Sequence, residues 1–250
     1  MYNNVKVDFC HFPNTLLVKV LASSLAVCWV LGLSGCATTR QVKNDKQSGF
    51  LGDYSMLRKG GKGEAGYLYV NTNAQWANYS KVWLKSIELW KADDPKSHLG
   101  KASPEAQQML VDSFHTAMHQ ALTNSFELVD HGGPGVLVIR GALTDGRPSK
   151  PAINLLSSVY PPLKLVSTAD RLITGTDLGV GAAFVEAEFT DGQTEQRVAA
   201  VMDARAGTKA LRTKADSRWG DLQRAYDWWA QRTQKRLMLF KQGDFSTAKL

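Results

Sequence analysis

The chain has 250 residues, with 30 Lys or Arg, 23 Asp or Glu and a formal net charge of +7. This length suits one domain with a substantial core, or two small ones. Its cysteines, Cys10, Cys28 and Cys36, all lie near the N-terminus, which excludes a disulfide, a thiolate nucleophile or a zinc–thiolate site in the rest of the chain.

Residues 1–35 have the organisation of an export signal. Lys6 and Lys19 are basic, and the run Val20–Leu33 is apolar and without charge. As a helix this run is about 21 Å long at about 1.5 Å per residue, whereas a bilayer core is about 30 Å thick. The sequence therefore predicts a cleaved signal peptide rather than a permanent membrane span.

The residues Leu33-Ser34-Gly35-Cys36 resemble the lipobox of bacterial lipoprotein precursors. The resemblance implies a diacylglyceryl group on the sulfur of Cys36, cleavage before Cys36 and acylation of the new amino terminus. Ala37 in the next position implies the outer membrane of a Gram-negative bacterium, with the protein on its periplasmic face. We expect residues 36–47 to be a solvated tether and residues 48–250 to be a single domain.

The positive charge remains after the signal is removed. Lys6, Lys19 and Asp8 leave with it, so 30 − 2 = 28 basic and 23 − 1 = 22 acidic residues remain, a net charge of +6. This charge favours anionic lipid headgroups, peptidoglycan or an acidic protein face as partners, or it reflects only a solvated basic surface. Nucleic acid is not expected in that compartment.

The first predicted elements are strands. Residues 66–71 (GYLYVN) indicate a strand, whereas residues 81–90 (KVWLKSIELW) fit either a strand or the helical spacing of their aromatic residues. Ser103-Pro104-Glu105 is typical of a helix start, and the apolar pattern predicts a helix that ends near Asn124. Strands are expected at 126–130 and 136–143.

Residues 147–178 contain no clear regular element. Within 152–166 the sequence is mostly apolar, and Pro161-Pro162 would interrupt a long helix. Connections of this length are uncommon unless they are functional or packed. Two readings stay open: a crossover that covers one face of the sheet, or a flap that faces the membrane or a partner.

A hairpin and a long helix complete the chain. Residues 180–190 and 195–205 flank Asp191-Gly192, a turn signal because both residues tolerate positive φ. Asp216 can cap the helix, whose apolar face is formed by Trp219, Leu222, Tyr226, Trp229, Thr233, Leu237 and Phe240. The sum is an α+β domain: a largely antiparallel sheet of about six strands, packed against two long amphipathic helices.

Several stretches together resemble a known family. "SGFLGDYSML" (48–57) and "RWGDLQRAYDWWAQRTQKRL" (218–237) are the most specific, and "SFELVDHGGPGVLVIRGALTD" lies between them. In this order, after the lipobox, they are similar to an uncharacterised bacterial lipoprotein family, domain of unknown function 3313. The resemblance implies a strand at 81–90 and supplies no activity.

Candidate reactive side chains are few. His115 and His119 share one helix face, but Thr116 stands where a metalloprotease motif needs glutamate, so we expect no metal site. Glu186 and Glu188 share one face of a strand, which we expect to be solvated. We predict no catalytic residues and no cofactor.

The C-terminal helix is the candidate for partner binding. Trp228, Arg232, Lys235 and Arg236 combine an aromatic residue off the apolar stripe with basic residues, a composition typical of binding hot spots. The alternative is that these side chains pack over neighbouring loops. For residues 48–59 we expect a first packed element, with a site around Asp53 and Tyr54 as the alternative.

The sequence thus predicts a lipid-anchored outer-membrane protein that acts without catalysis, as a binding or accessory protein of the cell envelope. The alternative is an envelope hydrolase or metal-binding protein with an unrecognised site. A simple spacer would not need two amphipathic helices and a core of this size.

Overall fold

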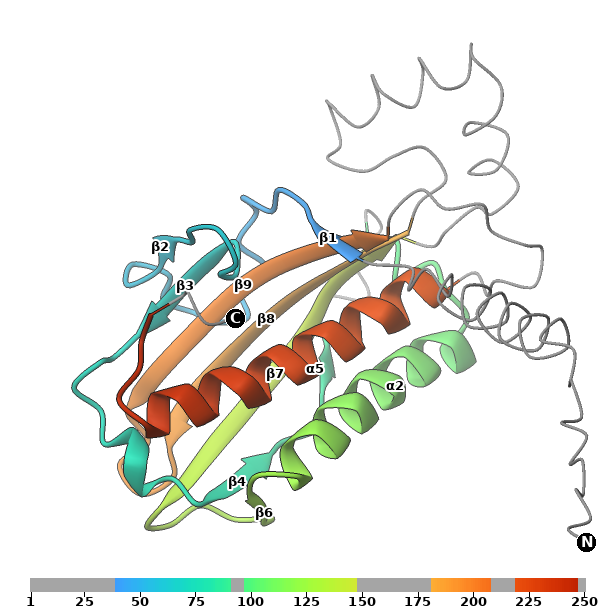
Figure 1. Cartoon of the computed structure of the whole chain (residues 1–250). Coiled ribbons are helices and arrows are strands. Elements are labelled where there is room, and N and C mark those ends of the chain that lie inside the picture. The colour runs from blue at the N-terminus through green and yellow to red at the C-terminus, as the bar shows by residue number, and fades with distance from the viewer. Residues whose placement is uncertain (1–38, 91–96, 148–180, 208–218, 247–250) are drawn as a thin grey trace, which may run out of the picture. The chain divides into compact units, whose positions relative to one another are not determined.

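The computed structural model describes residues 39–90, 97–147, 181–207 and 219–246 (Figure 1). The signal segment, Cys36, residues 152–166 and Asp216 lie outside these ranges. In the described residues, one curved sheet carries two long helices side by side on one of its faces (Figure 1).

The centre of the sheet is made of three long strands. They are β7 (Val136–Arg147), β8 (Ala182–Asp191) and β9 (Arg197–Gly207), and each is antiparallel to the next. Most of their residues are buried, because both faces of the sheet are covered. The edges consist of shorter strands.

Six short strands extend this centre. On the β9 side lie β3 (Tyr67–Val70), β2 (Arg58–Lys59) and β1 (Thr39–Gln41), all paired antiparallel. On the β7 side lie β4 (Lys81–Leu84), β5 (Glu88–Leu89) and β6 (Glu127–Leu128), all paired parallel. The described sheet therefore has nine strands rather than about six, and one side of it is parallel.

The two predicted helices are confirmed. Helix α2 (Pro104–Thr123) begins where expected: the Ser103 hydroxyl accepts a hydrogen bond from the backbone N–H of Ala106, and Pro104 needs no partner in the first turn. Helix α5 (Gly220–Lys241) buries the predicted apolar stripe against α2 and the sheet. In its first turn, buried Asp221 accepts a hydrogen bond of 2.8 Å from the backbone N–H of Gly181.

Residues 81–90 resolve into two short strands, β4 and β5. The only helical turn described near these strands is a short 3₁₀ helix just before them, Trp76–Asn78, in which Trp76 is buried. The family resemblance was therefore the better guide, and the helical reading of 81–90 was wrong.

The hairpin of β8 and β9 is also present, but the positive φ, 59°, falls on Glu195 and not on Asp191-Gly192. Gly192 is required for a different reason. A Cβ atom there would lie 2.8 Å from the carbonyl oxygen of Val136, to which the Gly192 N–H donates a hydrogen bond. The glycine lets the loop lie directly against the start of β7.

The predicted boundary between tether and domain at residue 48 was wrong. Thr39 pairs with Gly207 and Gln41 with Arg205, so the chain joins the sheet from Thr39 onward. Val42 is buried against Phe184 and the alanines of β8 and β9. All three residues of β1 are polar (Thr39, Arg40 and Gln41), so no alternation of apolar and polar residues indicates this strand in the sequence.

Residues 48–57 form a packed element, as predicted. Phe50 and Leu51 are buried against Ala142 and Ala200, on the face of the sheet opposite the helices. Gly49 and Gly52 have φ of 92° and 70°, so the two tight turns need glycine. We call residues 48–57 the N-terminal strap.

Candidate functional site

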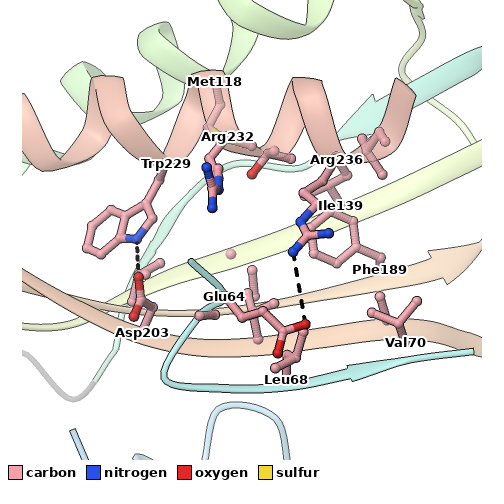
Figure 2. A pocket seen from close by; sticks show the side chains of 18 of the residues that line it. Glu64, Leu68, Val70, Met118, Ile139, Phe189, Asp203, Trp229, Arg232 and Arg236 are labelled. Carbon is pink, nitrogen blue, oxygen red and sulfur yellow. Dashed lines mark hydrogen bonds and ion pairs between the residues drawn. The ribbon is translucent and has the colours of Figure 1, made fainter. Parts of the chain in front are cut away.

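A cavity of about 120 Å³ lies between helix α5 and the sheet. Figure 2 shows its side chains converging from both layers. The apolar lining comes from β3, β7, β8, α2 and α5, and includes Leu68, Val70, Ile139, Phe189, Met118 and Trp229. Small side chains of the sheet, among them Ala187 and Ala199, leave the space that the facing residues of α5 do not fill.

Charged side chains also line this cavity. Arg232 and Arg236 reach into it from α5, and Glu64 and Asp203 reach into it from the sheet side (Figure 2). Arg232 donates a hydrogen bond to the carbonyl oxygen of Gly63. The Nη2 atom of Arg236 lies 4.0 Å from Oε1 of Glu64, an ion pair in which only 14% of the Arg236 side chain is exposed.

Glu64 is held mainly by another arginine. Arg58 makes two hydrogen bonds to its carboxylate, of 2.7 and 2.8 Å, and the backbone N–H of Gly61 makes a third of 2.9 Å. The bond from Arg58 is the largest cause that lowers the pKa of Glu64 from 4.5 to about 2. Glu64 is therefore ionised at neutral pH.

Asp203 is almost completely buried and has three hydrogen-bond donors. They are Nε2 of Gln41 at 2.7 Å, the backbone N–H of Gly66 at 3.0 Å and Nε1 of Trp229 at 2.7 Å. Burial is the largest influence and raises the pKa of Asp203, although these bonds act in the opposite direction. The aspartate joins β1, the loop before β3 and helix α5 at one point.

The four predicted partner-binding residues have different surroundings. Trp228 is half-buried between two guanidinium groups, Arg205 at 3.5 Å and Arg232 at 5.2 Å from its ring centre. Arg232 and Arg236 line the cavity and contact the loop at 63–64, whereas Lys235 is exposed. Three of the four thus pack over neighbouring segments, and only Lys235 points to solvent as a free surface residue would.

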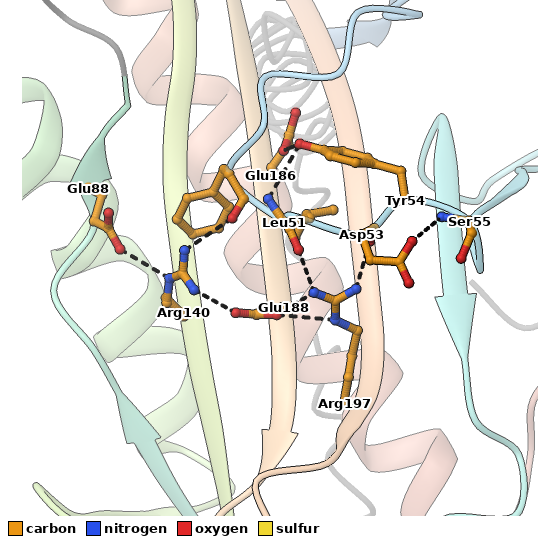
Figure 3. Close-up of polar contacts among 10 residues, drawn as sticks. Leu51, Asp53, Tyr54, Ser55, Glu88, Arg140, Glu186, Glu188 and Arg197 are labelled. Atoms are coloured by element: carbon orange, nitrogen blue, oxygen red, sulfur yellow. Dashed lines mark hydrogen bonds and ion pairs between the residues drawn. The ribbon is translucent and has the colours of Figure 1, made fainter.

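A second polar cluster fastens the N-terminal strap to the opposite face (Figure 3). Glu186 is completely buried; it accepts hydrogen bonds from the hydroxyl of Tyr54 at 2.5 Å and from the backbone N–H of Ser48 at 2.9 Å. The expectation that this face is solvated was therefore wrong. Ser48 and Tyr54 of the strap donate to the Glu186 carboxylate the hydrogen bonds that water would otherwise supply.

Glu188, two residues on, bridges two arginines. It accepts from Arg140 at 2.8 Å and from Arg197 at 2.9 Å. The same arginines donate to carbonyl oxygens of the strap: Arg140 to Phe50 at 3.1 Å and Arg197 to Leu51 at 2.6 Å (Figure 3). Every charge in this cluster has a structural partner, so the cluster is a fastening rather than an open site.

The histidine pair of α2 lies in a shallow groove. The ring centres of His115 and His119 are 6.2 Å apart, and Asp130 and His131 line the same groove. Within the described residues, no group of three or more His, Cys, Asp or Glu side chains is arranged to hold a metal ion. No described helix is long and apolar enough to cross a membrane.

Comparison with known sequences identifies the chain's relatives. Residues 46–233 match the family described as "Protein of unknown function (DUF3313)". The chain belongs to the DUF3313 family. Two relatives, both named "Uncharacterized lipoprotein YdcL", come from Escherichia coli strains K12 and O157:H7; each is 27% identical over 183 residues, which is 72% of this chain and 80% of the relative.

Solved structures offer a more distant likeness. Two structures of a PelC dodecamer from Paraburkholderia phytofirmans align with TM-scores of 0.36 and 0.35, at 11% and 12% identity. The alignments cover 67% and 68% of this chain and 94% of PelC. The DUF3313 match includes the N-terminal strap, the cavity-lining strands and most of α5.

Proposed function

We propose that this DUF3313 protein is an outer-membrane lipoprotein, anchored through lipid on Cys36, whose periplasmic domain binds a ligand or partner without chemically changing it. Membership of a family with relatives named lipoproteins supports the anchor. The lipobox around Cys36 supports the same conclusion from the sequence. The outer membrane is proposed from Ala37, the residue that follows the cysteine.

The observation that carries the binding role is the cavity under α5. Ligand sites are usually concave and apolar, with a few placed polar groups. This cavity has that composition, because apolar side chains surround it and two arginines enter from one helix. A core of native density leaves few voids larger than a water molecule, so a space of about 120 Å³ calls for an explanation.

The alternative, an envelope hydrolase or metal protein, would need reactive groups brought together. A hydrolytic site needs a nucleophile and a base within hydrogen-bond reach of each other. The polar groups at the described cavity are two arginines, a glutamate bound by Arg58 and an aspartate with three donors. This arrangement favours recognition over proton transfer.

The test compares two Ala→Leu substitutions in the lipidated, full-length protein purified from membranes. Ala187→Leu places a larger side chain inside the cavity, and Ala77→Leu makes the same change at an exposed position. Native mass spectrometry should detect a non-covalently bound molecule in the wild type and in Ala77→Leu, and lose it in Ala187→Leu. Identical bound species in all three proteins would contradict the proposal.

The anchor is tested separately. Mass spectrometry of the membrane fraction should find acylated Cys36, and Cys36→Ala should remove the protein from the outer membrane. An unmodified Cys36 in a processed chain would contradict the localisation.

A further inference from the structure

Four charged side chains line the cavity: Arg232 and Arg236 from α5, and Glu64 and Asp203 from the sheet side. Both carboxylates are already engaged, since Glu64 accepts three hydrogen bonds from Arg58 and Gly61, and Asp203 accepts three from other donors. The two arginines donate instead to backbone carbonyl oxygens, those of Gly63 and Ser246.

Arg236 has a donor atom that neither carboxylate satisfies. Its Nη1 atom donates to the carbonyl oxygen of Ser246 at 2.9 Å. Its Nη2 atom is buried and has no hydrogen-bond partner among the described residues, since 4.0 Å from Glu64 is too far for a hydrogen bond. A buried charged donor without an acceptor is costly, and such a donor in a native structure requires an explanation.

The electrostatic environment of the pair agrees with this geometry. Burial is the first cause that lowers the pKa of Arg236, and repulsion from Arg232 is the second. Burial also lowers the pKa of Arg232. Nearby carboxylates act in the opposite direction, Asp203 on Arg232 and Glu64 and Asp244 on Arg236, but burial remains the largest cause. An anion bound between the two guanidinium groups would offset the cost of their burial.

We propose that the cavity binds an amphipathic carboxylate, with its oxygens on Nη2 of Arg236 and beside Arg232, and its apolar body inside the cavity. This inference rests on the proposed function, in which the cavity is the ligand site. Arg236 supplies the anchoring donor, the Nη2 atom, which has no acceptor among the described residues. Trp229, Leu68 and Phe189 supply the apolar contact surface.

The volume limits the size of the ligand. A cavity of about 150 Å³ lined by apolar side chains holds one benzene molecule. At about 120 Å³, this cavity accommodates an apolar body of roughly that size or slightly smaller. A short or branched carboxylic acid fits the space, whereas a long fatty acid released from membrane lipid would leave most of its chain outside.

The experiment is isothermal titration calorimetry of the lipidated protein in nanodiscs, with empty nanodiscs subtracted. Four probes separate the contributions: hexanoate, hexanol, hexylamine and palmitate. We expect hexanoate to bind at least tenfold more tightly than hexanol, and hexylamine not to bind. Palmitate tests whether the ligand is a long fatty acid released from membrane lipid. Palmitate binding more tightly than hexanoate would overturn the size limit.

Two substitutions assign the binding to Arg236. Arg236→Gln should weaken hexanoate binding about tenfold to a hundredfold, because hydrogen bonds to charged groups are among the strongest. Lys235→Gln removes the same charge from the neighbouring exposed position and should change the affinity less than twofold. Arg236→Lys retains the charge and should recover part of the affinity, which separates a charge effect from misfolding.

The outcomes distinguish the inference from the proposed function. Equal binding of hexanol and hexanoate, or unchanged affinity in Arg236→Gln, overturns the carboxylate assignment. A neutral or cationic molecule found by native mass spectrometry would do the same while leaving the binding role intact. The binding role itself fails only if Ala187→Leu leaves the bound species unchanged.

Discussion

Tyr54→Phe tests how the N-terminal strap is held. The hydroxyl of Tyr54 donates to buried Glu186 at 2.5 Å and accepts from the backbone N–H of Gly49 at 2.8 Å. Burial, followed by the bond to Glu186, raises the pKa of Tyr54, so the hydroxyl remains protonated at neutral pH. The substitution keeps the ring and removes these two bonds, together with a longer one of 3.4 Å that the hydroxyl accepts from the backbone N–H of Leu51.

The expected loss of stability depends on which of the hydroxyl's partners stays buried without a replacement. The carboxylate of Glu186 loses one of its two donors inside the protein, at a cost of about 1–3 kcal/mol. The Gly49 N–H lies at the surface, where water replaces the hydroxyl at little cost. We expect about 2 kcal/mol in total, which corresponds to roughly a thirtyfold increase in local opening of the strap.

Hydrogen-exchange mass spectrometry of the amides in residues 49–57 measures that opening, and urea denaturation measures the global free energy of unfolding. Tyr67→Phe is the control, because Tyr67 bonds Asp45 at 3.1 Å in an exposed position. We expect less than about 0.5 kcal/mol from the control. If exchange of the strap in Tyr54→Phe rises no more than in the control, the bond to Glu186 does not hold the strap.

Three further predictions concern the cavity and the sheet. Lowering the pH should destabilise the fold through Glu64: because its pKa falls from 4.5 to about 2, mainly through Arg58, its contribution is complete above pH 4.5 and lost as the pH falls toward 2. The contribution is at most about 3 kcal/mol, and urea titrations should show the difference between wild type and Glu64→Gln shrinking over that range. Gly192→Ala should cost about 1–3 kcal/mol in urea denaturation, because its Cβ would lie 2.8 Å from a backbone oxygen; a wild-type midpoint would refute the close approach. Trp229→Phe should cost about 1–3 kcal/mol in the same assay, since it leaves buried Asp203 without its 2.7 Å indole donor, and an unchanged stability would show that the bond contributes nothing.

The elements that the sequence predicted best are those with strong periodic patterns. Ser103 and Pro104 indicate the start of helix α2, and the apolar stripe of α5 is regular over its whole length. The β8–β9 hairpin follows from alternating strands around Asp191. Such patterns depend on neighbours within a few residues, so a single sequence records them directly.

The covering of one sheet face by the N-terminal strap could not be predicted in the same way. The alternation of apolar and polar residues in β8 predicts that Glu186 and Glu188 face solvent, because this local pattern contains no information about a segment far away in the chain. One signal was available: Arg140 stands directly opposite Glu188 in the β7–β8 register, and such cross-strand pairs indicate a partnered rather than a free carboxylate. The burial of Glu186 depends on Tyr54 and Ser48, which no local pattern identifies.

The cavity was even less predictable. Its lining comes from strands and helices distributed over the chain from Gly63 to Phe240, and its volume depends on how small residues of the sheet face large ones of α5. The sequence marked Arg232 and Arg236 as candidates through their charge. It could not show that Arg236 is mostly buried, because the loop at 63–64 that covers it is distant in sequence.

The N-terminal strap also determines the order in which the chain can fold. Ser48 is made early in synthesis, but its acceptor on Glu186 lies 138 residues later, and Arg205, which donates to Thr39, lies 166 residues later. Contacts between such distant residues form slowly, because a long loop must close first. A chain interrupted before β9 would leave β1 without its pairing strand, and it would leave the strap with its contacts on β7 and β8 but without those of Arg197 and Ala200.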